Sequence, residues 1–185
     1  MGKHNEKIVQ WLCFLAMGFF VLWGLQAIFT KNTEFIFDRF FAAALVILGW
    51  KWRKELQLNW KTALLGLATL ALHHLKLYGN AYAGIPFDRI MHAAAGFTLA
   101  VLSYKAIEHE SKNHWKTAVL ALFLAFGIAS SIEIIEFIGY GWFGKGEGLL
   151  FYGTGDIGEY NNVAWDLISN MVGAVIGVIG SVWKK

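Results

Sequence analysis

The sequence contains one cysteine, one proline and few charged residues, and each shortage excludes a class of protein. Cys13 alone cannot form an internal disulfide bond or a metal site that needs several cysteines. Charged residues make up 16% of the 185 residues, and the formal net charge is only +3. The basic residues also cluster at the ends of apolar runs, so the sequence indicates no nucleic-acid partner.

Hydrophobic residues are abundant, at 57% of the chain against about 45–50% in soluble domains. Several apolar runs reach about 18 residues, the length that crosses a bilayer. The first run, residues 8–29, is roughly twice as long as the apolar part of a signal peptide and lacks a small-residue cleavage site. The sequence therefore predicts an all-α bundle, a single integral membrane domain over residues 1–185, with six transmembrane helices at about 8–29, 35–52, 60–78, 86–106, 115–140 and 163–183.

The positions of lysine and arginine predict the orientation of these helices. Most of the 16 such residues fall at the N-terminus, in the connections 51–61 and 105–116, and at the C-terminus. Because cytoplasmic loops carry an excess of basic residues, both termini are expected in the cytoplasm, in a multi-pass protein of the cell membrane. The lipid bilayer is the partner that the sequence implies directly, and the oligomeric state stays open.

A partial internal repeat supports this arrangement. Phe37-Asp38-Arg39 recurs as Phe87-Asp88-Arg89, and Trp60-Lys61-Thr62-Ala63 recurs as Trp115-Lys116-Thr117-Ala118. Each motif opens a predicted helix, so the hairpins 35–78 and 86–140 have the pattern of a parallel duplication about an axis along the membrane normal. Chance similarity between apolar helices is the competing explanation.

Polar residues inside the predicted helices collect at one level of the membrane. At 1.5 Å of rise per residue, they lie within roughly 10 Å of the outer surface. Ionisable groups at this depth are costly and usually face the protein interior or a watery site, where they bind ions or substrates. The residues concerned are Asp88, His92, Glu133, Glu136, Asp166 and Asn170.

The spacing of Asp88, His92, Glu133 and Glu136 places them in two pairs, each on one face of its helix. Asp88 and His92 are four apart, which suits a metal-ligand or acid–base pair. The same spacing also suits a first-turn carboxylate beside a histidine that bonds between helices. Glu133 and Glu136 are three apart, and two such carboxylates must share a proton or bind a metal or a basic group.

Asp166 and Asn170 lie on a helix face that also carries a row of glycines. Asp166 and Asn170 are four apart, and Gly173, Gly177 and Gly180 follow on roughly the same face. A glycine stripe is typical of close helix packing, so it predicts that Asp166 and Asn170 point into the bundle. Asn170 suits either a ligand site or a hydrogen-bond network between helices.

Two further residues are candidates for ligand binding. Arg89 either pairs with a neighbouring carboxylate, extends to the membrane surface, or clamps a phosphate or carboxylate of a ligand. Asp156 lies in the glycine-rich connection 141–162, which we expect to cap the cluster, although a solvated role is the alternative. Residues 153–158 fit G-x-G-x-x-G, but no predicted strand precedes them, so they do not indicate a dinucleotide site.

The order of these motifs resembles two related families of small prokaryotic membrane proteins, the VanZ-like proteins and, more closely, the YjdF type. The shared pattern covers about residues 85–180 and consists of Asp88, Arg89, His92, Glu133, Glu136, Trp165, Asp166, Asn170, Gly173 and Gly177. VanZ-like proteins have Lys and Gln where this chain has Arg89 and Glu136, which favours the YjdF type. The resemblance implies a prokaryotic cytoplasmic-membrane protein without a defined reaction, and the antibiotic resistance linked to VanZ-like proteins is not carried over.

The leading hypothesis is a membrane enzyme that acts on a lipid headgroup or a lipid-linked substrate, reached from the outer leaflet. In it, Asp88 orients His92, and the metal ligands or acid–base groups are His92, Glu133, Glu136 and Asp166. The cofactor is unknown; a divalent metal suits these residues, and Mg, Mn, Fe and Zn suit them about equally. The alternatives are a transport or binding protein for protons, small cations or small molecules, and a structural membrane protein.

Overall fold

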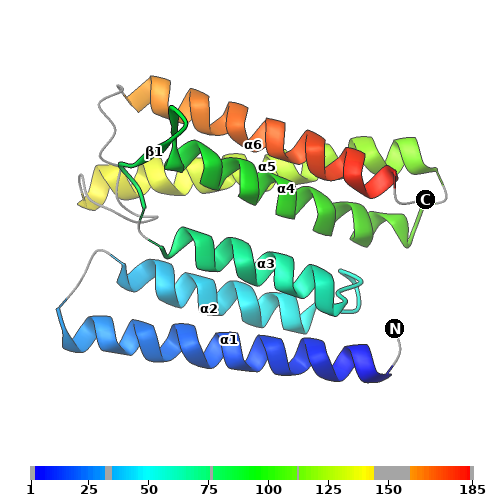
Figure 1. Ribbon diagram of the computed structural model, residues 1–185, viewed down its shortest axis with the longest axis horizontal. Helices are drawn as coiled ribbons and strands as arrows, with labels where there is room; N and C mark the ends of the chain where they lie inside the picture. Colours follow the sequence, from blue (N-terminus) through cyan, green and yellow to red (C-terminus); the bar gives the residue numbers. More distant parts are fainter. Residues whose placement is uncertain (1–2, 32–34, 76, 112, 144–158, 184–185) are drawn as a thin grey trace. The chain divides into compact units, whose positions relative to one another are not determined.

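A computed structural model describes residues 3–31, 35–75, 77–111, 113–143 and 159–183 of the chain. Most of these residues are helical, in agreement with the all-α prediction (Figure 1). The helices are α1 (Lys3–Phe29), α2 (Ile36–Lys51), α3 (Trp60–His73), α4 (Phe87–Glu108), α5 (His114–Phe143) and α6 (Glu159–Val182). Between α3 and α4, two short strands, β1 (Ala81–Tyr82) and β2 (Ile85–Pro86), pair antiparallel as a small hairpin that the sequence did not predict.

Four of the six helices are long and apolar enough to cross a membrane: α1, α4, α5 and α6. The predicted helix 60–78 ends earlier, at His73, where the backbone N–H groups of His74 and Leu75 donate to the carbonyls three residues before them and so tighten the last turn. With 14 residues, α3 is shorter than the 18 that such a span needs, and α2 has only 16. A helical membrane protein is thus supported, whereas the six-span count and the orientation stay predictions.

The ends of several helices follow from local sequence. The side-chain oxygen of Asn59 accepts hydrogen bonds from the backbone N–H groups of Lys61 and Thr62 at 3.0 and 3.1 Å, which caps α3. Asn113 caps α5 in the same way, through the N–H of Lys116 at 3.0 Å. The two helices that open with the repeated Trp-Lys-Thr-Ala motif therefore share their way of starting. The duplication itself stays a prediction.

The chain divides into two compact units, and the prediction of a single domain over residues 1–185 stays a prediction. The first unit comprises residues 1–70 and 134–154, and the second comprises residues 71–133 and 155–185. In the first unit, α1 and α2 lie side by side (Figure 1). Buried Arg39 of α2 donates to the backbone carbonyl of Trp23 at 3.0 Å, and its guanidinium lies 4.6 Å from the centre of the Trp23 ring.

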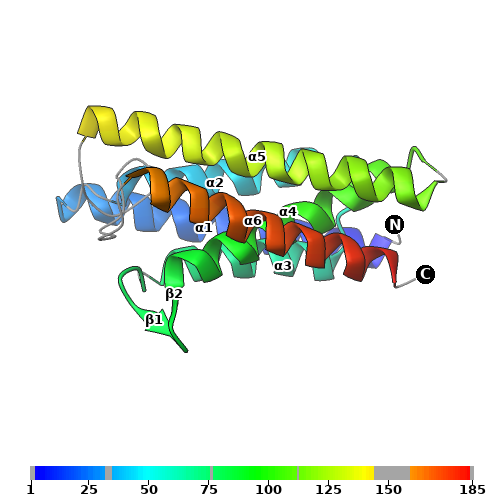
Figure 2. The same cartoon turned by 90° about the horizontal axis from the view of Figure 1, so that it is seen from above.

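In the second unit, α4 and α6 pack so closely that their backbones touch (Figure 1, Figure 2). A Cβ added at Gly173 would collide with the carbonyl oxygen of Ala93, and one at Gly96 with that of Asn170. A Cβ at Gly177 would lie 2.6 Å from the carbonyl oxygen of Phe97. The glycine stripe of α6 is therefore a packing surface, as predicted, except that Gly180 has nothing within 4 Å.

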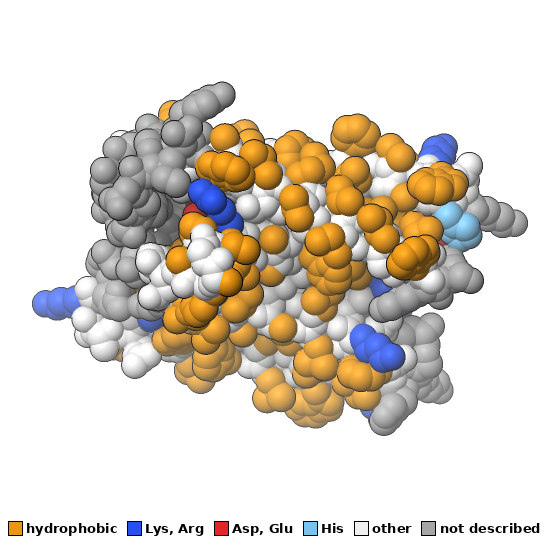
Figure 3. Space-filling view, turned by 45° about the horizontal axis from the view of Figure 1, so that its top comes forward, with side chains coloured by type: hydrophobic (Ala, Val, Ile, Leu, Met, Phe, Trp, Pro, Cys, Tyr) orange, Lys and Arg blue, Asp and Glu red, His pale blue; other side chains and the backbone are white. Residues whose placement is uncertain are grey.

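Small residues also bring α5 against this pair. A core cluster joins the three helices and consists of Ala100, Tyr104, Ala118, Ala121, Ala125, Ala174 and Val178. Large apolar side chains remain exposed on the same helices, among them Leu120, Phe123, Leu124, Val172, Ile176 and Ile179. Figure 3 shows hydrophobic side chains over much of the visible surface, as expected for helices whose outer faces meet lipid.

Gly173→Ala should test the packing of α4 on α6. The added methyl group meets backbone rather than a flexible side chain, so we expect a loss of about 1–3 kcal/mol of stability. Thermal unfolding of the purified protein in detergent would measure it, with Gly180→Ala as the control on the same helix. Equal unfolding temperatures for the two variants would contradict the close approach.

Candidate functional site

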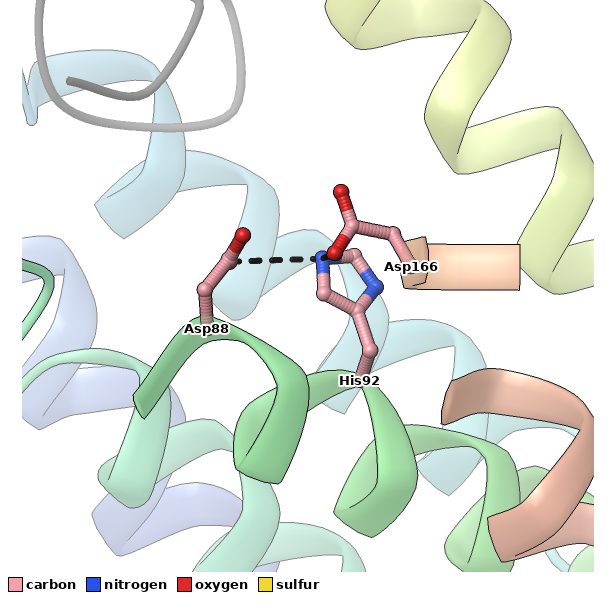
Figure 4. A group of neighbouring side chains, drawn as sticks. All are labelled: Asp88, His92 and Asp166. Atoms are coloured by element: carbon pink, nitrogen blue, oxygen red, sulfur yellow. Dashed lines mark ion pairs between the residues drawn. The ribbon is translucent and has the colours of Figure 1, made fainter. Parts of the chain in front are cut away.

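His92 lies at the centre of a group of carboxylates in the second unit. Its Nε2 lies 3.4 Å from an oxygen of Asp88 and 3.8 Å from an oxygen of Asp166, and its Nδ1 lies 3.2 Å from an oxygen of Glu133. Figure 4 shows Asp88 and Asp166 approaching the ring from α4 and α6. Residues from three helices, far apart along the chain, thus meet at one imidazole.

Helix geometry explains this convergence. Asp88 and His92 are one turn apart on α4, so their side chains share a face. The next residue, Ala93, is the one whose carbonyl oxygen touches Gly173, and Gly96 touches the backbone of Asn170. These contacts fix the register in which α6 passes α4, and this register sets Asp166 and Asn170 opposite His92.

Two asparagines complete the hydrogen bonding of the group. The side-chain amide nitrogen of Asn170 lies 3.0 Å from Nδ1 of His92 and donates to the Glu133 carboxylate at 3.3 Å. The amide of Asn162 donates to Asp166 at 2.7 Å. The predicted hydrogen bonds of Asn170 between helices are therefore present. Sequence analysis missed Asn162, although its position four residues before Asp166 on the same helix was a usable signal.

The imidazole has an acidic neighbour on each of its two nitrogens. A neutral imidazole carries one N–H and one lone pair, so it can donate to only one side. On the other side, the lone pair of the ring nitrogen faces carboxylate oxygens that also need a donor or a cation. At Nδ1 the Asn170 amide can donate to that lone pair, so a neutral ring is itself satisfied, but the surrounding carboxylates still require protons or a positive ion.

Burial makes this requirement stronger. Glu133 and Asp166 are 4% and 1% exposed, whereas the side chains of His92 and Asp88 keep 13% and 31% of their surface accessible. Three carboxylates and at most one imidazolium leave an excess of negative charge, which is costly inside an apolar helix bundle unless protons or a cation balance it. The accessible edge formed by Asp88 and His92 is the side from which such an ion can arrive.

The donor atoms have the number and spacing of a metal site. Asp88, His92 and Asp166 can each offer one ligand atom, and these atoms all lie within 4.8 Å of one another. Three protein ligands that leave a position for water or substrate are the pattern of a catalytic metal centre. Glu133, on the opposite ring nitrogen, lies where carboxylates commonly orient a metal-binding histidine.

The remaining candidates lie beside this group or outside it. Arg89 stacks on Trp165, with its guanidinium carbon 4.4 Å from the ring centre, a partner that sequence analysis did not predict. Glu136 follows Glu133 by three residues on α5 and belongs to the first unit, so its part in the site stays a prediction. Asp156 lies outside the described residues, and so does most of the loop that was expected to cap the cluster.

Asp166→Asn should stabilise the metal-free protein. The change keeps the shape of the side chain and an oxygen that can accept from Asn162, and it removes one of three crowded negative charges. We expect a gain on the order of 1 kcal/mol, seen as a higher unfolding temperature in detergent with a chelator. Glu55→Gln, which removes an exposed charge outside the group, is the control. A clear loss of stability would mean that Asp166 mainly links the helices.

Comparison with known proteins gives a family and no function. No curated protein and no solved structure matches the chain. One family model, described as predicted membrane protein (DUF2238), matches residues 9–185. This range contains every residue of the group around His92 and every helix with the length and composition of a membrane span, apart from the first residues of α1. The chain therefore belongs to the DUF2238 family of predicted membrane proteins.

Proposed function

We propose that the chain is a membrane enzyme that binds one divalent metal ion at the group around His92 and acts on a lipid headgroup or a lipid-linked substrate. The observation that carries this proposal is the imidazole with carboxylates on both nitrogens. A metal ion on one nitrogen and a hydrogen bond from the other would satisfy both sides at once.

The contacts favour a particular division of roles. Asp88, Asp166 and Nε2 of His92 would hold the ion, because their atoms lie together on one side of the ring. Glu133 would accept a hydrogen bond from Nδ1–H, and the Asn170 amide, which cannot donate to a protonated Nδ1, would donate to Glu133 alone and hold it in place. This division exchanges the roles that the sequence suggested for Asp88 and Glu133. It makes Asp88 a ligand and Glu133 the residue that orients the histidine.

The location supports a substrate at the membrane surface. Asp88 is the second residue of α4 and His92 lies one turn further, so the accessible edge of the group is near the end of a helix long enough to span the bilayer. Lipid headgroups lie at this level. A bound divalent ion with an open position would supply an activated water molecule for hydrolysis or a charge for orienting a substrate.

The finer family relationship and the location in the cell are also proposals. Membership of a membrane protein family agrees with the resemblance to the YjdF type, which is carried by the ordered motifs from Asp88 to Gly177. We infer from it a multi-pass protein of the prokaryotic cytoplasmic membrane. The distribution of lysine and arginine supports cytoplasmic termini.

Metal binding by purified variants tests the proposal. Wild-type protein that has been stripped with a chelator and then titrated with Mn²⁺ or Zn²⁺ should take up one ion per chain. His92→Ala should abolish this uptake because it removes a ligand, and Asp166→Asn should weaken it strongly because the remaining amide oxygen carries no charge. Glu133→Gln should weaken it about 10- to 100-fold, the usual effect of losing the group that orients a ligand. Elemental analysis and calorimetry would give the stoichiometry and the affinity.

Glu55→Gln is the matched control, because Glu55 is an exposed carboxylate that does not belong to the group. It should bind the ion like the wild type. Absence of uptake by the wild-type protein, or equal uptake by His92→Ala, would reject the metal site. Wild-type affinity in Glu133→Gln alone would leave the site standing and refute the role given to Glu133.

A further inference from the structure

Arg89 and Trp165 form a contact between helices directly beside the candidate metal site. The guanidinium of Arg89, on α4, lies 4.4 Å from the centre of the Trp165 ring, on α6. Arg89 follows Asp88 in the chain and Trp165 precedes Asp166, so each partner is the immediate neighbour of a carboxylate that contacts His92. The Arg–Trp pair therefore flanks the site on the same two helices.

The first copy of the Phe-Asp-Arg motif provides a comparison within the chain. Its arginine, Arg39, also stacks on a tryptophan of a neighbouring helix, with 4.6 Å between the guanidinium and the centre of the Trp23 ring. Arg39, however, is only 5% exposed and donates to the backbone carbonyl of Trp23. Its guanidinium is thus committed to packing within the first unit.

Arg89 differs from Arg39 in both respects. Its side chain is partly exposed, and among the described residues it makes neither an ion pair with a carboxylate nor a hydrogen bond. Stacking uses the flat face of a guanidinium and leaves the N–H groups on its edge available. Of the three roles considered from the sequence, pairing with a neighbouring carboxylate thus receives no support from the described contacts.

We propose that Arg89, held flat by Trp165, binds the phosphate group of the ligand that occupies the site. This proposal rests on the proposed function and names its substrate class, a compound that carries a phosphate ester. A planar guanidinium with two free N–H groups matches two phosphate oxygens at once. A phosphate placed here also suits a site at headgroup level, because a phosphate ester is a common component of lipid headgroups.

Binding of phosphate compounds to the full-length protein in an uncharged detergent tests the proposal. The probes are a short-chain phosphatidylglycerol, inorganic phosphate and a short-chain diacylglycerol, titrated calorimetrically with chelator present and again with Mn²⁺. Wild-type protein should bind phosphatidylglycerol more tightly than diacylglycerol. Arg89→Gln should lower the affinity for phosphatidylglycerol about tenfold, the effect expected from the loss of a charge-assisted pair of hydrogen bonds. Trp165→Leu should lower this affinity several-fold, because the Arg89 guanidinium loses the ring on which it stacks.

Arg53→Gln is the matched control. Arg53 also lies over a tryptophan, Trp50, at 5.2 Å, and it already pairs with Glu6 at 3.5 Å. Its removal changes the net charge by the same amount as Arg89→Gln, and it should leave the affinity unchanged. Should Arg89→Gln fail to fold, Trp165→Leu tests the same site without a change in net charge, and the wild type is then its reference.

The probes distinguish a lipid source of the phosphate from a soluble one. They also test this inference independently of the proposed metal site. Inorganic phosphate that binds with the same dependence on Arg89 would support a soluble phosphorylated ligand, and binding of the acylated probe alone would support a lipid headgroup. Equal affinities of wild type and Arg89→Gln, or no binding of either phosphate probe, would overturn the inference. Binding that depends on Arg89 in a protein that takes up no metal would refute the metal site and keep the phosphate site.

Discussion

The close approach of α4 and α6 is the constraint on which the candidate site depends. Gly96, Gly173 and Gly177 allow the two backbones to touch, and each contact pairs a glycine with a carbonyl group of the facing helix. Contacts of this kind fix both the distance between the helices and their register, because neither backbone can slide without a collision. With the register fixed, Asp166 and Asn170 can only lie beside His92. A residue larger than glycine would separate Asp166 and Asn170 from His92 as well as the helices.

Much of this arrangement could be predicted from the sequence, and the reason lies in helix periodicity. Apolar runs gave the positions of the helices to within a few residues for α2, α4 and α6, and spacings of four placed Asp88 with His92 and Asp166 with Asn170. Spacing assigns residues to a face but does not say which atom faces which. The separation of Glu133 from the aspartates by the imidazole, and the pairing of Arg89 with Trp165, depend on the rotation of one helix against another. The early end of α3 depends on backbone turns at His74 and Leu75, which an apolar run does not reveal.

The two copies of the Phe-Asp-Arg motif illustrate how one local pattern can lead to two different surroundings for its arginine. In both copies the arginine stacks on a tryptophan from another helix, at 4.6 Å for Arg39 and 4.4 Å for Arg89. The difference lies one turn later, where α2 has Ala42 and α4 has His92. Without an imidazole, the first copy has no centre around which carboxylates can gather, and its arginine is buried against Trp23. In the second copy, Arg89 stays partly exposed beside the carboxylates that surround His92.

The positions of the carboxylates along their helices show what the proposed cation would add to the site. Asp88 lies in the first turn of α4, where the positive end of the helix dipole stabilises a carboxylate. This effect fades within one turn, so it does not reach Asp166, well inside α6, or Glu133, far from the start of α5. These two side chains are also the most buried of the three, at 1% and 4% exposure. Two asparagine amides and one imidazole share their charge, and an imidazolium ion neutralises only one carboxylate. A divalent ion on the accessible side of His92 would offset the carboxylates that neither the helix dipole nor the asparagines can balance.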